Sequence, residues 1–153
     1  MRRNDKAMRD AADIRSVIEN ARVCRLGMVD GDKPYVVPLC FGYDGESLYF
    51  HGALKGRKID VLQQNPNVCF EFDAISETIT AEDPCGWSMQ YRSVIGFGKA
   101  ELVEDAAGKR EALKMIMAQY SEGTFTFPEN KVAGTAVFRV AIDSMTGKQS
   151  GVE

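Results

Sequence analysis

The sequence predicts a mainly β, antiparallel barrel with a few short helices, organised as one domain over residues 1–153. Five or six runs show the two-residue alternation, or the enrichment in Val, Ile, Phe and Tyr, that is typical of strands. Turn signals such as Asp44-Gly45 separate several of these runs and favour hairpins. Helical patterns are few and short, so a parallel sheet with crossover helices is not expected.

In the first half of the chain, a helix is expected around residues 14–21, with Asp10 or Asp13 as its cap, because apolar residues recur there at helical spacing. Strands are expected at residues 22–30, 34–43 and 47–51. Pro38 lies inside the second of these strands, which predicts a bulge or an unpaired stretch.

In the second half, a short helix should begin near Gly56 and end at Asn65-Pro66. A strand at residues 68–74 should bury Val68, Phe70 and Phe72 on one side, and residues 78–81 extend it or pair with it. Residues 91–103 predict a long strand bent at two glycines. Asp105 should cap a second helix, residues 123–130 should form a loop, and the last strand is expected at residues 136–142.

Composition excludes several classes of protein. A chain of 153 residues with 44% hydrophobic and 27% charged residues has the balance of one globular domain. The net charge of −3 gives no reason to expect a nucleic-acid partner, and no apolar run approaches the ~18–20 residues of a membrane helix. No apolar segment follows the charged N-terminus, so a secretory signal is not expected. We therefore expect a cytoplasmic protein without nucleic-acid or membrane partners.

The four cysteines lie far apart in sequence, at Cys24, Cys40, Cys69 and Cys85. Zinc sites and thioredoxin-like sites need close pairs of cysteines, so neither is expected, and the sequence offers no other metal site. All four occur in apolar, strand-like surroundings. They are expected to be buried free thiols in a reducing compartment.

The segment from His51 to Asp60 is the most informative in the chain. It follows a strand and opens a helix, where free N–H groups and a partial positive charge already favour anions. Lys55, Arg57 and Lys58 add three cations at this unfavourable end, and Gly52 and Gly56 would let backbone amides approach a ligand. A bound phosphate monoester resolves the electrostatic conflict. The same pattern also fits a solvated charge run beside a turn.

Several blocks along the chain resemble one known family. They are Arg22-Val23-Cys24-Arg25-Leu26-Gly27, Pro34-Tyr35-Val36-Val37-Pro38, Tyr49-Phe50-His51 with Gly56-Arg57-Lys58, Tyr91-Arg92-Ser93-Val94-Ile95-Gly96-Phe97-Gly98, and Met145-Thr146-Gly147-Lys148. In order and spacing they resemble the pyridoxamine 5′-phosphate oxidase-like FMN-binding split barrels, and more closely the NimA-type branch of nitroimidazole reductases. The resemblance covers nearly the whole chain.

This resemblance implies a six-stranded antiparallel Greek-key split β-barrel with a few short peripheral helices, and a homodimer with FMN at the subunit interface. It places the FMN phosphate at Arg57 and Lys58. The residues implied to contact the rest of the flavin lie in three segments: Pro38, Leu39, Cys40 and Phe41; His51, Gly52 and Ala53; and Arg92, Ser93 and Val94. Trp87 or the segment 145–148 would close the site from the partner subunit.

His51 is the single histidine of the chain, and the NimA-type branch has a histidine at the matching position. An imidazole titrates near neutrality, so His51 could give a proton to a reduced substrate or hold a small carboxylate. It could equally pack against the cofactor or bond the backbone. The C-terminal segment with Trp and Arg that grips pyridoxal phosphate in the oxidase itself has no counterpart here, so vitamin B6 oxidation is not expected.

Three functions follow from the resemblance. The first is an FMN-dependent oxidoreductase that reduces a small nitroaromatic or related acceptor. The second keeps the split barrel but uses haem or a deazaflavin, because fold alone does not fix function. The third is a non-catalytic flavin-binding or sensor dimer. Phe125, Phe127 and the Met-rich face of the second long helix offer apolar surface for dimerisation.

Overall fold

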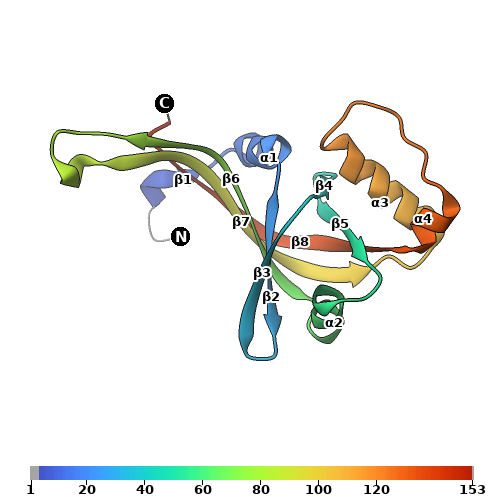
Figure 1. Cartoon of the computed structure of the whole chain (residues 1–153). Helices are drawn as coiled ribbons and strands as arrows, with labels where there is room; N and C mark the ends of the chain where they lie inside the picture. The colour runs from blue at the N-terminus through green and yellow to red at the C-terminus, as the bar shows by residue number, and fades with distance from the viewer. Residues whose placement is uncertain (1–3, 153) are drawn as a thin grey trace.

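One antiparallel sheet of eight strands organises the chain, and the computed structural model describes residues 4–152, without the side chains of Asn4, Ile75 and Ser76 (Figure 1). Residues 1–3 and 153, which the single-domain prediction includes, lie outside the described part. Six strands are long: β2 (Cys24–Asp30), β3 (Lys33–Leu39), β5 (Ser47–Ala53), β6 (Asn67–Ile79), β7 (Ser88–Leu102) and β8 (Thr135–Ser150). Two more, β1 (Ala7–Met8) and β4 (Gly42–Tyr43), have two residues each. The mainly β, antiparallel fold class is confirmed.

The hydrogen-bonded order is β3-β2-β6-β7-β8-β5-β4, and β1 pairs with the far end of β8. The path does not return from β4 to β3, although only Cys40 and Phe41 separate these two strands along the chain. The barrel is therefore open between its first and last strands. This opening leaves the end of β3 and the end of β5 accessible on the same molecule.

Short helices cover parts of the sheet: α1 (Ala11–Asn20), α2 (Arg57–Gln64), α3 (Ala106–Ala118) and α4 (Glu129–Ala133). Two one-turn 3₁₀ helices, η1 (Asn4–Lys6) and η2 (Pro84–Gly86), complete the description. The expected caps are present, because Asp10 accepts from the Ala12 N–H at 2.8 Å and Asp105 accepts from the Gly108 N–H at 2.7 Å. Of the described helices, none is long and apolar enough to cross a membrane.

Aromatic side chains fill the core between the curved sheet and the helices. Phe70 and Phe72 are fully buried, as the alternation along β6 predicts, and Phe72 contacts Phe41 with ring centroids 4.8 Å apart. Gly96 lets β7 pass close to this cluster, since a Cβ there would lie 2.1 Å from Cζ of Phe70. Gly96 therefore serves close packing, and the ladder between β7 and β8 shifts its register at the second glycine, Gly98.

Pro38 does not form a bulge. Its register with Arg25 is continuous, from Cys24 opposite Leu39 to Asp30 opposite Lys33. The prediction was wrong because β3 is an edge strand of the sheet, where a proline that lacks an N–H costs no ladder hydrogen bond on the open side.

The last strand is longer than residues 136–142, because β8 continues to Ser150 and pairs with β7 along its whole length. Its second half is polar and irregular in pattern, with a register shift near Phe97 and Gly98, so it carries no alternation signal. The expectation of four buried thiols was also wrong in part. Cys24 is buried and Cys69 half-buried, whereas Cys40 lies in an exposed loop and Cys85 in the exposed helix η2.

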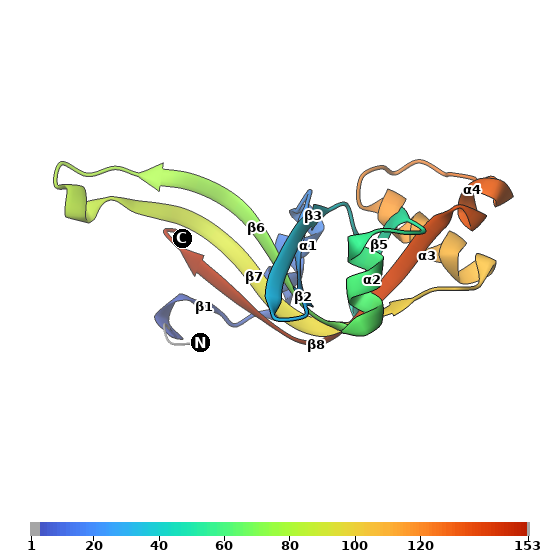
Figure 2. The same ribbon diagram turned by 60° about the horizontal axis from the view of Figure 1, so that its bottom comes forward.

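β6 and β7 extend beyond the rest of the sheet as a hairpin arm, defined here as residues 77–89. Both views show the arm reaching away from the body of the molecule, on the side opposite α3 and α4 (Figures 1 and 2). Every residue of the arm is exposed. Its tip is ordered locally, since Trp87 donates from Nε1 to the Ala81 carbonyl at 2.8 Å while its side chain stays 55% exposed.

Candidate functional site

The corner between β5 and α2 gathers most of the predicted phosphate-binding residues. The chain leaves β5 at Ala53 and enters α2 at Arg57 through Gly56, whose φ of +142° is accessible mainly to glycine. The N–H groups of Ile59 and Asp60 both donate to the Gly56 carbonyl, and no side chain caps the helix. The N–H groups that a helix leaves free at its start are therefore available to an anion.

Lys58 folds back from α2 onto β5. A Cβ at Gly52 would lie 3.2 Å from the Lys58 Nζ, so the glycine makes room for the ammonium group. The same Nζ lies 5.6 Å from the centroid of the Phe138 ring. Burial lowers the pKa of Lys58, which indicates an ammonium group that lacks part of its hydration.

His51 lies beside this ammonium group on β5. Its ring is on the exposed side of the strand, while Phe50 before it points into the core. Burial, and then the positive charge of Lys58, lower the pKa of His51, so the imidazole is neutral near pH 7. The structure thus brings together His51, Gly52 and Lys58, as the sequence predicts.

Arg57 points to the other side of the corner, toward the hairpin of β2 and β3. Its Nε donates to the Asp30 carboxylate at 2.8 Å, and its Cζ lies 4.3 Å from the centroid of the Tyr35 ring. Sequence reasoning did not find Asp30 and Tyr35 as neighbours of Arg57. Asp30 was expected as the last residue of a strand, and no local pattern links it to a residue 27 positions later.

The segment Pro38–Phe41 runs from the end of β3 into the barrel opening. Cys40 is exposed, and Leu39 is half-buried. Phe41 is fully buried and donates its N–H to the Tyr120 hydroxyl at 3.1 Å; that hydroxyl in turn donates to the Arg22 carbonyl at 2.9 Å. Phe41 therefore offers packing rather than a free N–H, and backbone groups for a ligand would come from residues 38–40.

The remaining predicted residues, Arg92, Ser93 and Val94, lie at the other end of the sheet. On β8, Val137 pairs with His51 and Gln149 pairs with Arg92. These β8 residues are separated by roughly 40 Å of strand at ~3.3 Å per residue. Val94 is buried in the core, and Arg92 and Ser93 point to opposite faces because they are adjacent in a strand. One chain does not bring these residues to the β5–α2 corner.

The outer face of β7 is apolar and exposed between the β5–α2 corner and the arm. Ile95 is 46% exposed and Phe97 is 55% exposed, on the face that continues along the strand to Met89 at the arm. We call Met89, Ile95 and Phe97 the β7 stripe. Phe125, which the sequence suggested for an interface, is 36% exposed and lies apart from the stripe, after α3.

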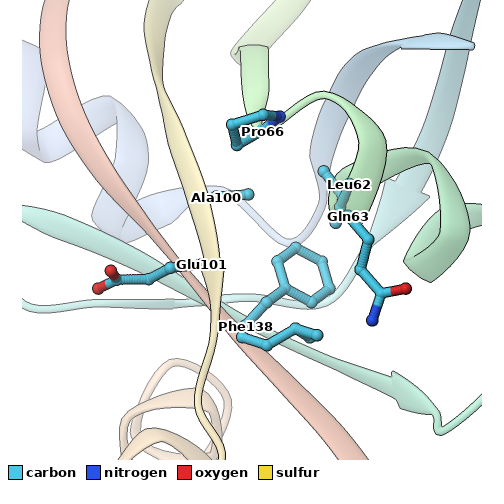
Figure 3. Close-up of a pocket in the computed structure, with 7 residues that line it drawn as sticks. Leu62, Gln63, Pro66, Ala100, Glu101 and Phe138 are labelled. Carbon is cyan, nitrogen blue, oxygen red and sulfur yellow. The ribbon is translucent and has the colours of Figure 1, made fainter.

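A small cavity of about 230 Å³ lies at the C-terminal part of α2, lined by Leu62, Gln63, Pro66, Ala100, Glu101, Leu102 and Phe138 (Figure 3). Its walls are mainly apolar, and it includes neither His51 nor Arg57. The candidate site is therefore the open basic corner and not this cavity. No group of three His, Cys, Asp or Glu side chains that could hold a metal ion occurs among the described residues.

The sheet forms an antiparallel barrel that is open on one side and carries a basic corner at the opening. This architecture places the protein in the class of split barrels. The model of the family described as pyridoxamine 5′-phosphate oxidase matches residues 10–149. The chain belongs to this family, and the resemblance stated from the sequence is confirmed.

Solved structures agree with this assignment. A candidate 5-nitroimidazole antibiotic resistance protein from Bacteroides thetaiotaomicron is 38% identical, with a TM-score of 0.85 over 93% of this chain and 85% of that protein. The flavocytochrome Anf3 from Azotobacter vinelandii is 22% identical, with a TM-score of 0.87 over 99% of this chain and 72% of that protein. An FAD- and haem-binding protein from Mycobacterium smegmatis is 20% identical, with a TM-score of 0.87 over 96% of this chain and 74% of that protein. The last two likenesses bear on the fold alone.

Proposed function

We propose that this chain binds FMN and works as an oxidoreductase that reduces small nitroaromatic or related acceptors. The observation that carries the proposal is the β5–α2 corner, where the uncapped start of α2 is flanked by Lys58 on the β5 side and by Arg57 on the side of the β2–β3 hairpin. A phosphate monoester accepts charge-assisted hydrogen bonds from all three, each contributing about 1.5–3 kcal/mol. The likeness to the candidate nitroimidazole resistance protein supports the choice of acceptor.

The flavin site is proposed to form between two copies of the chain. In one chain Arg92 and Ser93 lie far along the sheet from His51, Arg57 and Lys58. A homodimer would bring the first group of one copy to the second group of the other. The β7 stripe supplies exposed apolar area for such an interface, and the hairpin arm carries Trp87 outward, where it would reach a partner's site.

Bound FMN would supply hydride transfer, which no amino-acid side chain can perform. The chain's own contribution is to hold the phosphate at Arg57 and Lys58 and to line the flavin with residues 38–40. His51 would hold or move a proton at its imidazole, beside the bound acceptor. Burial, and then the positive charge of Lys58, lower the pKa of His51; a phosphate near Lys58 would offset the second of these causes and raise the pKa of the imidazole.

The test is an absorbance spectrum of the purified chain after FMN is added and unbound FMN is removed, compared with the Arg57→Ala/Lys58→Ala double variant. We expect flavin bands in the parent and at least a tenfold loss of affinity in the variant, because two charged phosphate contacts are removed. Retained flavin without turnover, with any nicotinamide donor and a panel of nitro compounds, would leave a non-catalytic flavin-binding dimer. A parent that binds haem or a deazaflavin but no FMN would contradict the proposal.

A further inference from the structure

The hairpin of β2 and β3 reaches the candidate phosphate site through two side chains. β2 ends at Asp30, and the turn that follows passes through Gly31 at φ +67° into β3 at Lys33. Tyr35 is the third residue of β3. The turn therefore sets where Asp30 and Tyr35 lie relative to the start of α2, which packs beside β2 (Figure 2).

Asp30 holds the Arg57 guanidinium at its Nε edge, and the Tyr35 ring covers one of its faces. Asp30 accepts from Nε at 2.8 Å, and the Tyr35 ring stacks under the group with its centroid 4.3 Å from Cζ. A guanidinium has five N–H donors in a rigid plane. With Nε taken by Asp30, the four N–H donors of the two terminal nitrogens remain for a planar, two-point contact with phosphate oxygens.

We propose that Asp30 and Tyr35 are positioning residues, which fix Arg57 so that the site prefers a flavin that carries a phosphate monoester over the same flavin without it. This inference rests on the proposed function, since it assigns a role to residues around the FMN phosphate. It adds that phosphate selectivity depends on two side chains of this hairpin that act on the phosphate only through Arg57.

Asp30 has two opposing effects on a bound phosphate. Its negative charge repels the phosphate, whereas its hydrogen bond orders a long side chain that would otherwise sample many rotamers. The Arg57 side chain is 57% exposed and that of Asp30 is 35% exposed, so water and salt screen the repulsion strongly. Ordering a free arginine side chain costs enough to change affinity by roughly tenfold. Positioning therefore outweighs repulsion, and removing Asp30 should weaken FMN binding.

The experiment measures dissociation constants for FMN and for riboflavin with the full chain and four variants. Asp30→Ala and Tyr35→Leu should each raise the FMN constant by roughly tenfold and leave the riboflavin constant within about twofold. Tyr35→Phe keeps the ring and should bind FMN like the parent. Glu111→Ala is the matched control, because it removes an exposed carboxylate paired with Lys114 at 2.7 Å on α3, away from the site.

Three results would overturn the inference. The first is unchanged or tighter FMN binding by Asp30→Ala while the parent binds FMN, since repulsion would then outweigh positioning. An equal loss of FMN and riboflavin would mean that Asp30 supports the fold and not the phosphate contact; a thermal melt of the milder Asp30→Asn variant separates this case from unfolding. If the parent binds neither flavin, the proposed function fails as well, and this result is distinct from the other two.

Discussion

Gly52 lies beneath the Lys58 ammonium group, and a methyl group there would come within 3.2 Å of Nζ and 3.5 Å of Cε. The lysine is flexible, so Gly52→Ala should displace it without unfolding the strand. Because Gly52 is in a strand and Ala costs less entropy there, we expect a change in unfolding free energy of less than about 1 kcal/mol. FMN affinity should fall by roughly three- to tenfold, since one charged phosphate contact is weakened.

Fluorescence titration with FMN, together with urea unfolding, checks this expectation. Gly134→Ala is a suitable control, because its Cβ would approach the Asn130 carbonyl at a similar 3.3 Å, beside β8 and not at the basic corner. An FMN affinity equal to that of the parent in Gly52→Ala would show that Lys58 does not need its present position to hold the phosphate.

At the scale of single residues, the sequence predicted the basic corner but not the side chains that hold Arg57 in place. Lys55, Arg57 and Lys58 sit together in the chain at a helix start, so the local electrostatic conflict is visible from the residues alone. Tyr35 and Asp30 act on Arg57 only through the fold. The role of Tyr120, which takes the Phe41 N–H, is hidden for the same reason, because 79 residues separate the two.

At the scale of elements, β7 pairs with β8 so closely at Gly98 that only glycine fits. A Cβ at Gly98 would lie 2.2 Å from the Ala141 carbonyl oxygen and 2.8 Å from Cγ1 of Val140, next to the register shift of the ladder. The obstacle is backbone, which cannot rotate away as a side chain can. Gly98→Ala should therefore destabilise the fold by about 1–3 kcal/mol, as overpacked sites in well-packed interiors do.

Urea unfolding, followed by circular dichroism, measures this effect, and Lys99→Ala on the exposed face of the same strand is the control. The control should stay within about 0.5 kcal/mol of the parent. A Gly98→Ala variant as stable as the parent would mean that β7 and β8 can separate locally at the register shift without cost.

Helices and strands whose apolar residues recur at a regular spacing were predictable from the sequence, and those without such a spacing were not. In β6, the alternation of Val68, Phe70 and Phe72 identifies the side of the strand that faces the core. Asp105 marks the start of α3 as its N-cap. The second half of β8 is stabilised by pairing with β7 on one side and, at Gly147 and Lys148, with β1 on the other. Such pairing depends on partners distant in sequence, so the pattern of the residues alone ended the expected strand at residue 142.

At the scale of the whole molecule, the predicted site residues lie in two separate regions of the chain and do not form one pocket. The sequence grouped Arg92, Ser93 and Val94 with His51 only through the family resemblance, and no feature of the residues indicates how far apart they lie. The distance follows from the register of three long strands. A single chain therefore holds the basic corner and the residues Arg92, Ser93 and Val94 at opposite ends of the sheet.

Phe97 offers the sharpest test of this arrangement, because it is a large apolar side chain, 55% exposed at the centre of the outer sheet face. A two-fold interface repeats each substitution on both copies, so Phe97→Glu would place two like charges in an apolar contact. We expect the dimer dissociation constant to rise by more than roughly tenfold. Light scattering should then report a lower molar mass for the variant than for the parent at the same concentration. FMN retention should fall too, although Arg57 and Lys58 are untouched.

Met115→Glu is the matched comparison, because it makes the same change in charge at a Met that is 39% exposed on α3, the helix that the sequence also offered as an interface, away from the β7 stripe. It should leave both oligomeric state and flavin retention as in the parent. A Phe97→Glu chain that stays dimeric and keeps its flavin would move the interface to another face. A monomeric chain that still holds FMN as tightly as the parent would have a different meaning: the β5–α2 corner and residues 38–40 would suffice for the flavin, and the distant Arg92 and Ser93 would have no part in holding it.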